Sequence, residues 1–253
     1  MAIYATTGGA SGIGEALIAR LKADGHQIIN VDIKEADIIA DLSGREGRQA
    51  AIDGILAQAP DGLDGFIPLA GLGGGSAPNN LITSVNYFGT IELVEGLRDV
   101  LKARAGNIVL LTSNSAPMQV EGDSFVADLL AGDEAAALAN KEVIDGTQYM
   151  LTKRAIVHWM QRNIMSLGED GIRINAVAPG PVLTPMTEPL FNSPEYAPIM
   201  QGLLDDTPIK RAAQPEEIVE CILFLLSDKS RYVGGTVLFV DGGYDAHVRQ
   251  DRI

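Results

Sequence analysis

Short, continuously apolar runs alternate with amphipathic helical patterns along the whole chain, and this alternation limits the possible folds more than any other feature. Strands that are apolar throughout belong to a sheet that is covered on both faces. The predicted strands are 2–7, 27–33, 65–71, 107–113, 173–179 and 236–242. The predicted helices are 12–24, 44–58, 81–103, 149–167 and 215–227. The pattern predicts an α/β fold with a doubly wound parallel sheet flanked by helices.

The chain is long enough for one domain of this kind. Its 253 residues include 46% hydrophobic residues and 28 glycines, which allow a sizeable core and many tight turns. No Ser/Pro-rich linker, low-complexity run or internal repeat marks a boundary. We therefore expect a single domain over residues 1–253.

Charge and cysteine content exclude several classes of partner. The formal net charge is −14, and the basic residues are scattered, whereas nucleic acids and anionic membranes bind positive patches. The single cysteine, Cys221, rules out an intrachain disulfide, and with three histidines it shows no zinc-ligand spacing, so we expect no metal. There is no signal-peptide pattern and no apolar run near the roughly 20 residues that span a bilayer. We expect a cytoplasmic protein that binds neither nucleic acid nor membrane.

A glycine-rich turn follows the first predicted strand and leads directly into the next helix. It reads Thr7-Gly8-Gly9-Ala10-Ser11-Gly12-Ile13-Gly14. Glycines let backbone N–H groups approach a diphosphate, and the helix N-terminus adds a favourable dipole. Any tight strand-to-helix turn also needs glycine, so this turn alone does not establish a dinucleotide site.

Asp32 stands at the end of the second predicted strand. A carboxylate there can accept hydrogen bonds from the adenosine ribose hydroxyls of NAD, and it would repel the 2′-phosphate of NADP. Lys34 is near enough to weaken that repulsion, and Asp32 could instead cap a helix. Together with the glycine turn, Asp32 favours NAD. Asp41 could face the adenine amine or cap the helix that starts near Ser43.

Tyr149 and Lys153 are four positions apart and therefore lie on one face of a predicted helix. A tyrosine, with an ordinary pKa of about 10, exchanges protons near neutrality only if its phenolate is stabilised, and an adjacent ammonium supplies part of that stabilisation. Such pairs also occur by chance on helix surfaces. Ser113, at a predicted strand end, could hydrogen-bond a reacting oxygen, and Asn86 could disturb regular helix bonding and hold a water that reaches Lys153. Each could be a simple cap or polar helix residue, but with the glycine turn they indicate a reaction site.

In these motifs the chain resembles the short-chain dehydrogenase/reductase family, and the resemblance covers nearly the whole chain. The family's marks are Thr-Gly-x-x-x-Gly-x-Gly near the N-terminus, an Asn/Ser/Tyr/Lys tetrad with Tyr-x-x-x-Lys, and a Pro-Gly segment after the sixth strand of the family fold. The counterparts here are Thr7 to Gly14, the tetrad Asn86, Ser113, Tyr149 and Lys153, and the segment 175–186. Many relatives have Asn-Asn-Ala-Gly after the fourth strand; this chain has Leu69-Ala70-Gly71-Leu72, so only the Ala-Gly backbone contact carries over. The resemblance implies a Rossmann-type fold.

A narrower resemblance is to the bacterial 3α-hydroxysteroid dehydrogenase/carbonyl reductases. It rests on the stretches 25–52, 64–73, 84–93 and 240–246. It also rests on the 36-residue spacing from Ser113 to Tyr149, which is well beyond that of most of the family. The enlarged segment 114–148 contains an alanine-rich stretch, and we expect extra helix there, at the active-site rim or against another subunit.

The resemblance implies an NAD-dependent oxidoreductase that transfers hydride between the nicotinamide and a carbonyl carbon. Tyr149 would donate a proton to the oxygen, and Ser113 would orient that oxygen. Lys153 would lower the pKa of the tyrosine and bind the nicotinamide ribose, while Asn86 would support a water-mediated proton path. The expected cofactor contacts are Gly8, Ser11, Gly12, Ile13, Gly14, Asp32, Asp41, Leu42, Ala70, Gly71, Tyr149, Lys153, Pro179, Val182 and Thr184. A homodimer or homotetramer is expected, as is usual in the family.

Residues 180–211 are expected to form a substrate lid. Their apolar side chains include Met186, Leu190, Phe191 and Met200. No cation cluster invites a carboxylate or a CoA phosphate, which favours a hydrophobic ketone or secondary alcohol, with 3α-hydroxysteroids as the preferred class. Another alicyclic, terpenoid or aryl secondary alcohol is the alternative. A non-catalytic dinucleotide sensor would be expected to lose Tyr149 or Lys153, and both are present.

Overall fold

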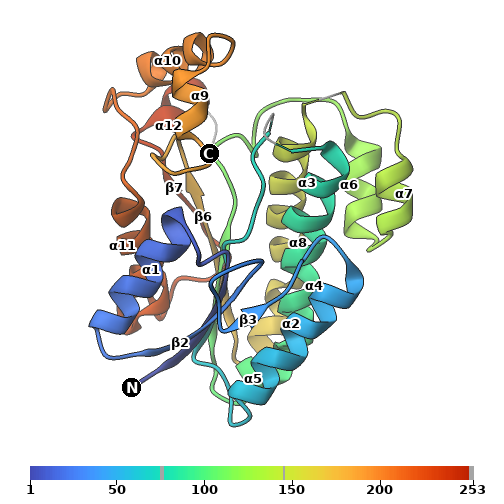
Figure 1. Cartoon of the computed structure of the whole chain (residues 1–253), viewed down its shortest axis with the longest axis vertical. Coiled ribbons are helices and arrows are strands. Elements are labelled where there is room, and N and C mark those ends of the chain that lie inside the picture. The colour runs from blue at the N-terminus through green and yellow to red at the C-terminus, as the bar shows by residue number, and fades with distance from the viewer. Residues whose placement is uncertain (75–76, 145, 251–253) are drawn as a thin grey trace.

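A computed structural model describes residues 1–74, 77–144 and 146–250, and within them one parallel sheet forms the centre of the molecule (Figure 1). Its strand order is β3-β2-β1-β4-β5-β6-β7. The strands are β1 (Ile3–Thr7), β2 (Gln27–Asp32), β3 (Ile38–Ile39), β4 (Gly65–Pro68), β5 (Asn107–Leu111), β6 (Arg173–Pro179) and β7 (Val237–Val240). The single-domain, doubly wound α/β fold expected from the sequence is confirmed.

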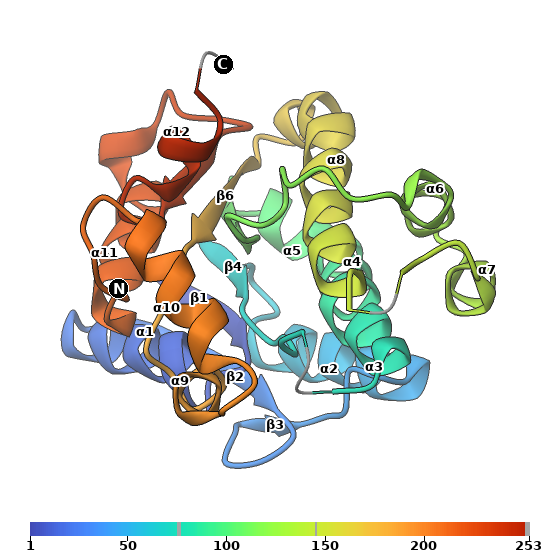
Figure 2. The ribbon, with the colours of Figure 1, turned by 90° about the horizontal axis from the view of Figure 1, so that it is seen from above.

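Helices cover both faces of the sheet, as Figures 1 and 2 show from two directions. One layer holds α1 (Gly12–Ala23) and α11 (Pro215–Leu226); the other holds α2 (Arg45–Gln58), α4 (Gly89–Gly96), α5 (Arg98–Lys102) and α8 (Gln148–Glu169). Neighbouring residues of β4 belong to different layers, because Phe66 packs in the core beneath α2, α4 and α8 and Ile67 in the core beneath α1 and α11. Both are 0% exposed. This burial on both sides explains why the strands are apolar throughout.

The order of strands reverses at β1, which pairs with β2 on one side and with β4 on the other. The chain runs outward from β1 through β2 to β3, then returns to place β4 next to β1 and runs outward again to β7. Loops that leave β1 and β4 therefore diverge over opposite faces of the sheet. A crevice forms at such a switch point, outside the carboxyl ends of the strands.

Three parts of the predicted secondary structure differ from the structure. The strand β3 was missed because it has only two residues, of which Ile39 is 62% exposed, so it carries no continuous apolar run. The single helix predicted over 81–103 is divided into α3 (Asn79–Thr83), a π-helical turn η1 (Ser84–Phe88), α4 and α5. The predicted strand 65–71 ends as β4 at Pro68.

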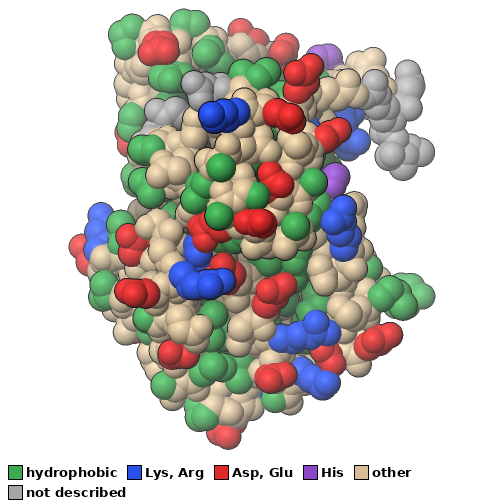
Figure 3. Space-filling model, turned by 90° about the vertical axis from the view of Figure 1, so that its right-hand side faces the viewer, with side chains coloured by type: hydrophobic (Ala, Val, Ile, Leu, Met, Phe, Trp, Pro, Cys, Tyr) green, Lys and Arg blue, Asp and Glu red, His purple; other side chains and the backbone are tan. Residues whose placement is uncertain are grey.

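The enlarged segment contains two further helices, α6 (Asp123–Leu130) and α7 (Glu134–Ala139), which lie outside α3 and α8 (Figure 2). Phe125 and Leu129 of α6 are buried against the core of the same chain. On the face that α6 and α7 help to form, basic side chains are spread among acidic ones (Figure 3). The predicted segment 114–148 includes position 145, and the predicted domain 1–253 includes 75–76 and 251–253; these positions lie outside the described residues.

The segment 180–211 contains α9 (Glu188–Asn192) and α10 (Ala197–Asp206), which stand over the carboxyl ends of the strands (Figure 1). The remaining short helices are η2 (Asp228–Ser230) and α12 (Tyr244–Val248). Within the described residues, no helix is both long and apolar enough to cross a membrane.

Candidate active site at the carboxyl ends of the strands

The glycine turn after β1 is pressed against the loop that follows β4. Gly8 has a φ of +76°, and a Cβ there would lie 2.6 Å from the Ala70 nitrogen. A Cβ on Gly14 would lie 2.1 Å from the Gly8 carbonyl oxygen. A side chain at Gly8 would therefore push the two loops apart, and one at Gly14 would push the start of α1 away from the glycine turn. Ser11 precedes α1 without a side-chain cap, so the first N–H groups of this helix are open to an anion.

Asp32, at the end of β2, faces this turn. Its Oδ2 accepts a hydrogen bond of 3.0 Å from the Ala10 backbone N–H, and its Oδ1 accepts one of 2.7 Å from the Ile33 N–H. The carboxylate thus holds the glycine turn and still presents oxygen lone pairs to the crevice. Lys34, the cation that the sequence places nearby, is exposed at the rim.

Asp41 and Leu42 follow β3 and form the wall of the crevice beyond Asp32. Asp41 Oδ1 accepts a hydrogen bond of 2.9 Å from the Ser43 backbone N–H. Hydrogen bonds from Ser43 lower the pKa of the Asp41 carboxyl. Of the two roles expected for Asp41, the contact to the turn before α2 is therefore present in the structure.

Lys153 and Tyr149 lie on the face of α8 that points toward the crevice. The Lys153 side chain is 4% exposed, and its Nζ lies 5.8 Å from the centroid of the Tyr149 ring. The Nζ also donates a hydrogen bond of 2.9 Å to the carbonyl oxygen of Leu111, at the end of β5. Burial lowers the pKa of Lys153 to about 8. Burial raises the pKa of the Tyr149 hydroxyl, and its hydrogen bond with Ser113 acts in the opposite direction.

Ser113 lies just beyond the end of β5. Its Oγ is 2.9 Å from the Ser115 Oγ, and it accepts a hydrogen bond of 3.1 Å from the Ser115 backbone N–H. The backbone on either side is held by β6, because the Thr112 and Asn114 N–H groups donate to β6 carbonyls. The serine is therefore fixed in position against the tyrosine. Ser115 was not predicted from the sequence. The only signal of it there is its Ser-x-Ser spacing from Ser113.

Asn86 lies in the π-helical turn η1 and is 0% exposed. The expected disturbance of regular helix bonding is therefore present. Its Oδ1 accepts a hydrogen bond of 2.7 Å from the Leu72 N–H, and its Nδ2 donates one of 3.0 Å to the Leu72 carbonyl. The side chain thus positions the loop after β4, beside Gly71 and Lys153.

All the other predicted site residues line one cavity of about 560 Å³. They are Gly8, Ser11, Gly12, Ile13, Gly14, Asp32, Asp41, Leu42, Ala70, Gly71, Ser113, Tyr149, Lys153, Pro179, Val182 and Thr184. Residues that sequence reasoning missed include Leu81, Val85 and Thr187, which line the same cavity. A second hollow of about 900 Å³, beside Arg154, His158 and Arg249, contains none of the predicted site residues.

The predicted lid begins directly against the glycine turn. A Cβ on Gly12 would lie 3.2 Å from the Thr184 Cγ2, and Val182 pairs with Ala213 in an isolated bridge that holds the start of the segment. Met186 is 41% exposed and lines the cavity, whereas Met200 is buried within the segment itself. Of the apolar side chains expected to meet a substrate, Met186 is therefore the one that the structure brings to the cavity.

The arrangement brings a proton-transfer group, a buried amine and an orienting hydroxyl to one end of a crevice. At the other end are a glycine turn with an open helix N-terminus and the Asp32 carboxylate. Among the described residues, no group of three or more His, Cys, Asp or Glu side chains could hold a metal ion. Such a site can bind an extended dinucleotide and exchange a proton with a small oxygen-containing molecule beside it.

Comparisons with known proteins agree with this geometry. A family model described as enoyl-(acyl carrier protein) reductase matches residues 134–245. The 3α-hydroxysteroid dehydrogenase/carbonyl reductase of Comamonas testosteroni is 36% identical, with 98% of each chain covered. Coniferyl-alcohol dehydrogenase of a Pseudomonas species is 30% identical, with 94% of each chain covered.

Among solved structures, the 3α-hydroxysteroid dehydrogenase from a Pseudomonas species, crystallised with NADH, superposes with a TM-score of 0.93. It is 36% identical, and the match covers 99% of this chain and 100% of that one. The similarity therefore extends over the full fold and includes every element that builds the crevice. The chain belongs to the short-chain dehydrogenase/reductase family.

Proposed function

We propose that this protein is an NAD-dependent secondary-alcohol dehydrogenase and carbonyl reductase, with 3α-hydroxysteroids as its preferred substrate class. The observation that carries the proposal is the convergence of Tyr149, Lys153 and Ser113 in the same cavity as the glycine turn and Asp32. The relatives that are named for 3α-hydroxysteroid dehydrogenase activity support the substrate class.

The glycine turn fits the diphosphate of a dinucleotide. Gly8 and Gly14 leave space where a Cβ would meet backbone, and the uncapped N-terminus of α1 offers N–H groups to an anion. Asp32 and the Asp41–Leu42 wall would hold the adenosine, and Lys153 with Pro179, Val182 and Thr184 would hold the nicotinamide ribose and its ring. Bound NADH supplies the hydride that reduces the carbonyl carbon.

The protein's own part is to orient the substrate oxygen and to move its proton. Ser113, held by Ser115, keeps its hydroxyl aimed at that oxygen and at Tyr149. In ketone reduction, Tyr149 donates its phenolic proton to the oxygen as the hydride arrives at carbon. Lys153 in its ammonium form stabilises the resulting phenolate, and the reverse sequence oxidises the alcohol.

Asp32→Asn is expected to weaken NADH binding by about tenfold to a hundredfold, because the charge-assisted hydrogen bonds to the ribose are lost. Asparagine keeps an acceptor for the Ala10 N–H, so the glycine turn should retain its shape. Loss of the negative charge should also narrow the preference for NADH over NADPH. Fluorescence titration with both cofactors measures the change.

Asp37→Asn is the matched control, since Asp37 also accepts a backbone hydrogen bond, from the Asn30 N–H at 2.8 Å, in the same region. It should leave the cofactor preference unaltered. An unchanged affinity of the Asp32 variant for both cofactors would contradict the assignment of Asp32 to the ribose.

A second candidate function is the oxidation of another alicyclic, terpenoid or aryl secondary alcohol. The similarity to coniferyl-alcohol dehydrogenase favours it, as do the apolar side chains of Leu81, Val85 and Met186 that line the cavity. A non-catalytic dinucleotide sensor is the least supported of the candidates, because the Tyr149 and Lys153 pair is complete.

A substrate screen tests the proposal. The protein is assayed with NAD and with NADP against 3α-hydroxysteroids, cyclohexanols and aryl carbinols, and NADH formation is followed by absorbance. We expect steroid turnover with NAD. Turnover of the smaller alcohols without any steroid activity would reject the substrate class, and NADH binding without turnover of any alcohol would favour the sensor.

We also propose that the enzyme works in the cytoplasm as a homodimer or homotetramer. The family's usual assembly supports the oligomer, while α6 covers part of α8, and α7 part of α3, which limits the surfaces available for contact. A solution mass measurement distinguishes the two assemblies from a monomer.

A further inference from the structure

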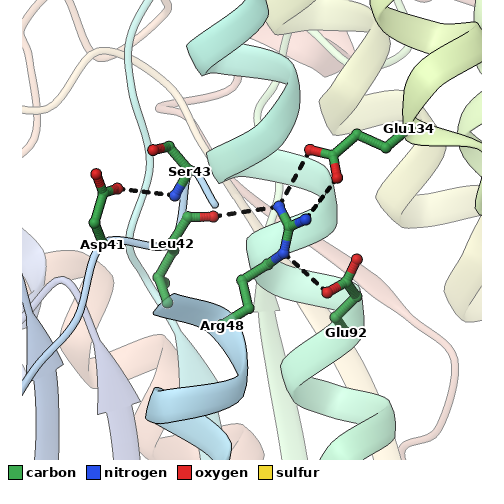
Figure 4. A network of polar contacts seen from close by, with 6 residues as sticks. All are labelled: Asp41, Leu42, Ser43, Arg48, Glu92 and Glu134. Atoms are coloured by element: carbon green, nitrogen blue, oxygen red, sulfur yellow. Dashed lines mark hydrogen bonds and ion pairs between the residues drawn. The ribbon is translucent and has the colours of Figure 1, made fainter. Parts of the chain in front are cut away.

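Arg48 of α2 is the most unusual buried side chain outside the candidate site. It is 1% exposed, and it belongs to none of the motifs that point to function. A guanidinium carries a permanent charge and five N–H donors, so its burial requires partners that supply both negative charge and acceptors. Figure 4 shows that these partners come from three separate parts of the chain.

The partners surround the guanidinium. Glu134 of α7 forms a bidentate contact, in which Arg48 Nη2 donates to Oε2 at 2.5 Å and Arg48 Nη1 donates to Oε1 at 3.2 Å. Glu92 of α4 places its Oε2 2.8 Å from Nε. The Leu42 carbonyl accepts from Nη1 at 3.4 Å. The Phe88 ring lies 5.8 Å from the guanidinium carbon.

The contact to Leu42 connects this cluster with the crevice. Residues 41–43 line the same cavity as the glycine turn and Asp32. They are confined by neighbours on two sides: a Cβ on Gly47 would lie 1.9 Å from the Asp41 carbonyl oxygen, and one on Gly89 would lie 3.2 Å from the Leu42 Cβ. Arg48 holds the carbonyl between these two contacts, so its position helps to determine where the wall at 41–43 stands.

The contact to Glu134 connects the cluster with the enlarged segment. Glu134 opens α7, whose first turn is held by Asp133 through a hydrogen bond from the Ala136 N–H at 2.9 Å. The bidentate contact of Glu134 fixes the plane of the guanidinium, because each carboxylate oxygen accepts from a different Arg48 nitrogen. A change at Glu134 would let the guanidinium turn toward Glu92 and away from Leu42.

We propose that Arg48 is a positioning residue for the adenine side of the cofactor site, and that Glu134 makes this positioning depend on the inserted helix α7. The inference rests on the proposed NAD site. Among the described residues, the ion pairs and hydrogen bonds of the Arg48 side chain reach α4, α7 and Leu42, whereas the nicotinamide end would be built by β5, β6 and α8. The cluster should therefore affect binding of the adenosine half and leave chemistry at the nicotinamide unchanged.

Glu134→Gln tests this without removing the buried arginine. Three ligands are compared: NADH, ADP-ribose, which lacks the nicotinamide, and reduced nicotinamide mononucleotide, which lacks the adenosine. We expect the dissociation constants of NADH and ADP-ribose, measured by fluorescence and calorimetric titration, to rise by about five- to tenfold. The turnover number at saturating NADH and the kcat/KM with the mononucleotide should stay within about twofold of the unmodified enzyme.

Asp170→Asn is the matched control, because Asp170 also joins two cations, Arg98 and Lys102, but far from the crevice. Asp170→Asn should leave the dissociation constants of NADH and ADP-ribose and the kcat/KM with the mononucleotide unchanged. The proposal would be overturned if Glu134→Gln bound NADH as tightly as the unmodified enzyme. It would also be overturned if the kcat/KM with the mononucleotide fell by the same factor as the NADH affinity. An unmodified enzyme that binds neither NADH nor ADP-ribose would instead reject the proposed NAD site itself.

Discussion

Tyr149→Phe is expected to lower turnover in both directions by about two to four orders of magnitude while NADH binding stays intact. Phenylalanine keeps the ring that packs beside Lys153 and removes only the hydroxyl, so the substrate oxygen has no proton donor. Steady-state kinetics and NADH titration of the same preparation give the two quantities.

The pH profile provides a second measure of the same role. Burial raises the pKa of Tyr149, so alcohol oxidation, which needs the phenolate, should accelerate as the pH rises. Ketone reduction, which needs the phenol, should slow over the same range. The phenylalanine variant should lose this dependence in its residual activity. Tyr232→Phe is the control, since Tyr232 is fully exposed. Near-normal turnover of Tyr149→Phe would contradict the assignment of Tyr149 as the proton donor.

Lys153→Met is expected to abolish most activity and, at the same time, to increase the free energy of unfolding at pH 7. The pKa of Lys153 is about 8 in the folded protein against an ordinary value of 10.5, because the ammonium is buried. Below pH 8 both the folded and the unfolded chain carry this charge, and the cost of burying it is fully present. Methionine has a similar length and no charge, so it removes that cost.

The size of the effect follows from the difference in pKa. It corresponds to at most about 3 kcal/mol, and loss of the hydrogen bond to the Leu111 carbonyl reduces the net gain to about 1–2 kcal/mol. Between pH 8 and 10.5 the folded protein releases the proton before the unfolded chain does, so the stability of the unmodified enzyme rises and the gain from methionine shrinks.

Urea denaturation of both proteins at pH 7 and pH 9.5 measures this change. Lys22→Met, at an exposed position of α1, should show no pH-dependent difference. A stability gain that is the same at both pH values would mean that packing, and not the buried charge, is responsible. The prediction identifies Lys153 as a residue kept for function at the expense of stability.

The parts of the site that follow one another closely in the chain were predictable. The glycine turn and the i, i+4 spacing of Tyr149 and Lys153 are set by local backbone geometry, which the order of residues displays directly. The placement of Asp32 follows from the same logic, because a residue at the end of a parallel strand must emerge at the shared edge of the sheet.

The contacts that orient these groups were not predictable. Asn86, in a π-helical turn that no hydrophobic period indicates, bonds to Leu72. Ser115 contacts Ser113 in a loop that β6 holds through the Thr112 and Asn114 N–H groups. Arg48 was assigned no role from the sequence. It is buried because Glu92 and Glu134, far along the chain, reach it in space.

The sequence by itself determined the fold class and the family and proposed the candidate catalytic residues, because these depend on local periodicity and on spacings within single elements. Only the tertiary structure decided which side chains hold those residues in place, where α6 and α7 pack, and which residues of 180–211 line the cavity. Those outcomes depend on contacts between elements that are distant in the chain. The energies of such contacts arise from burial and charge compensation, and these are created only when the layers come together.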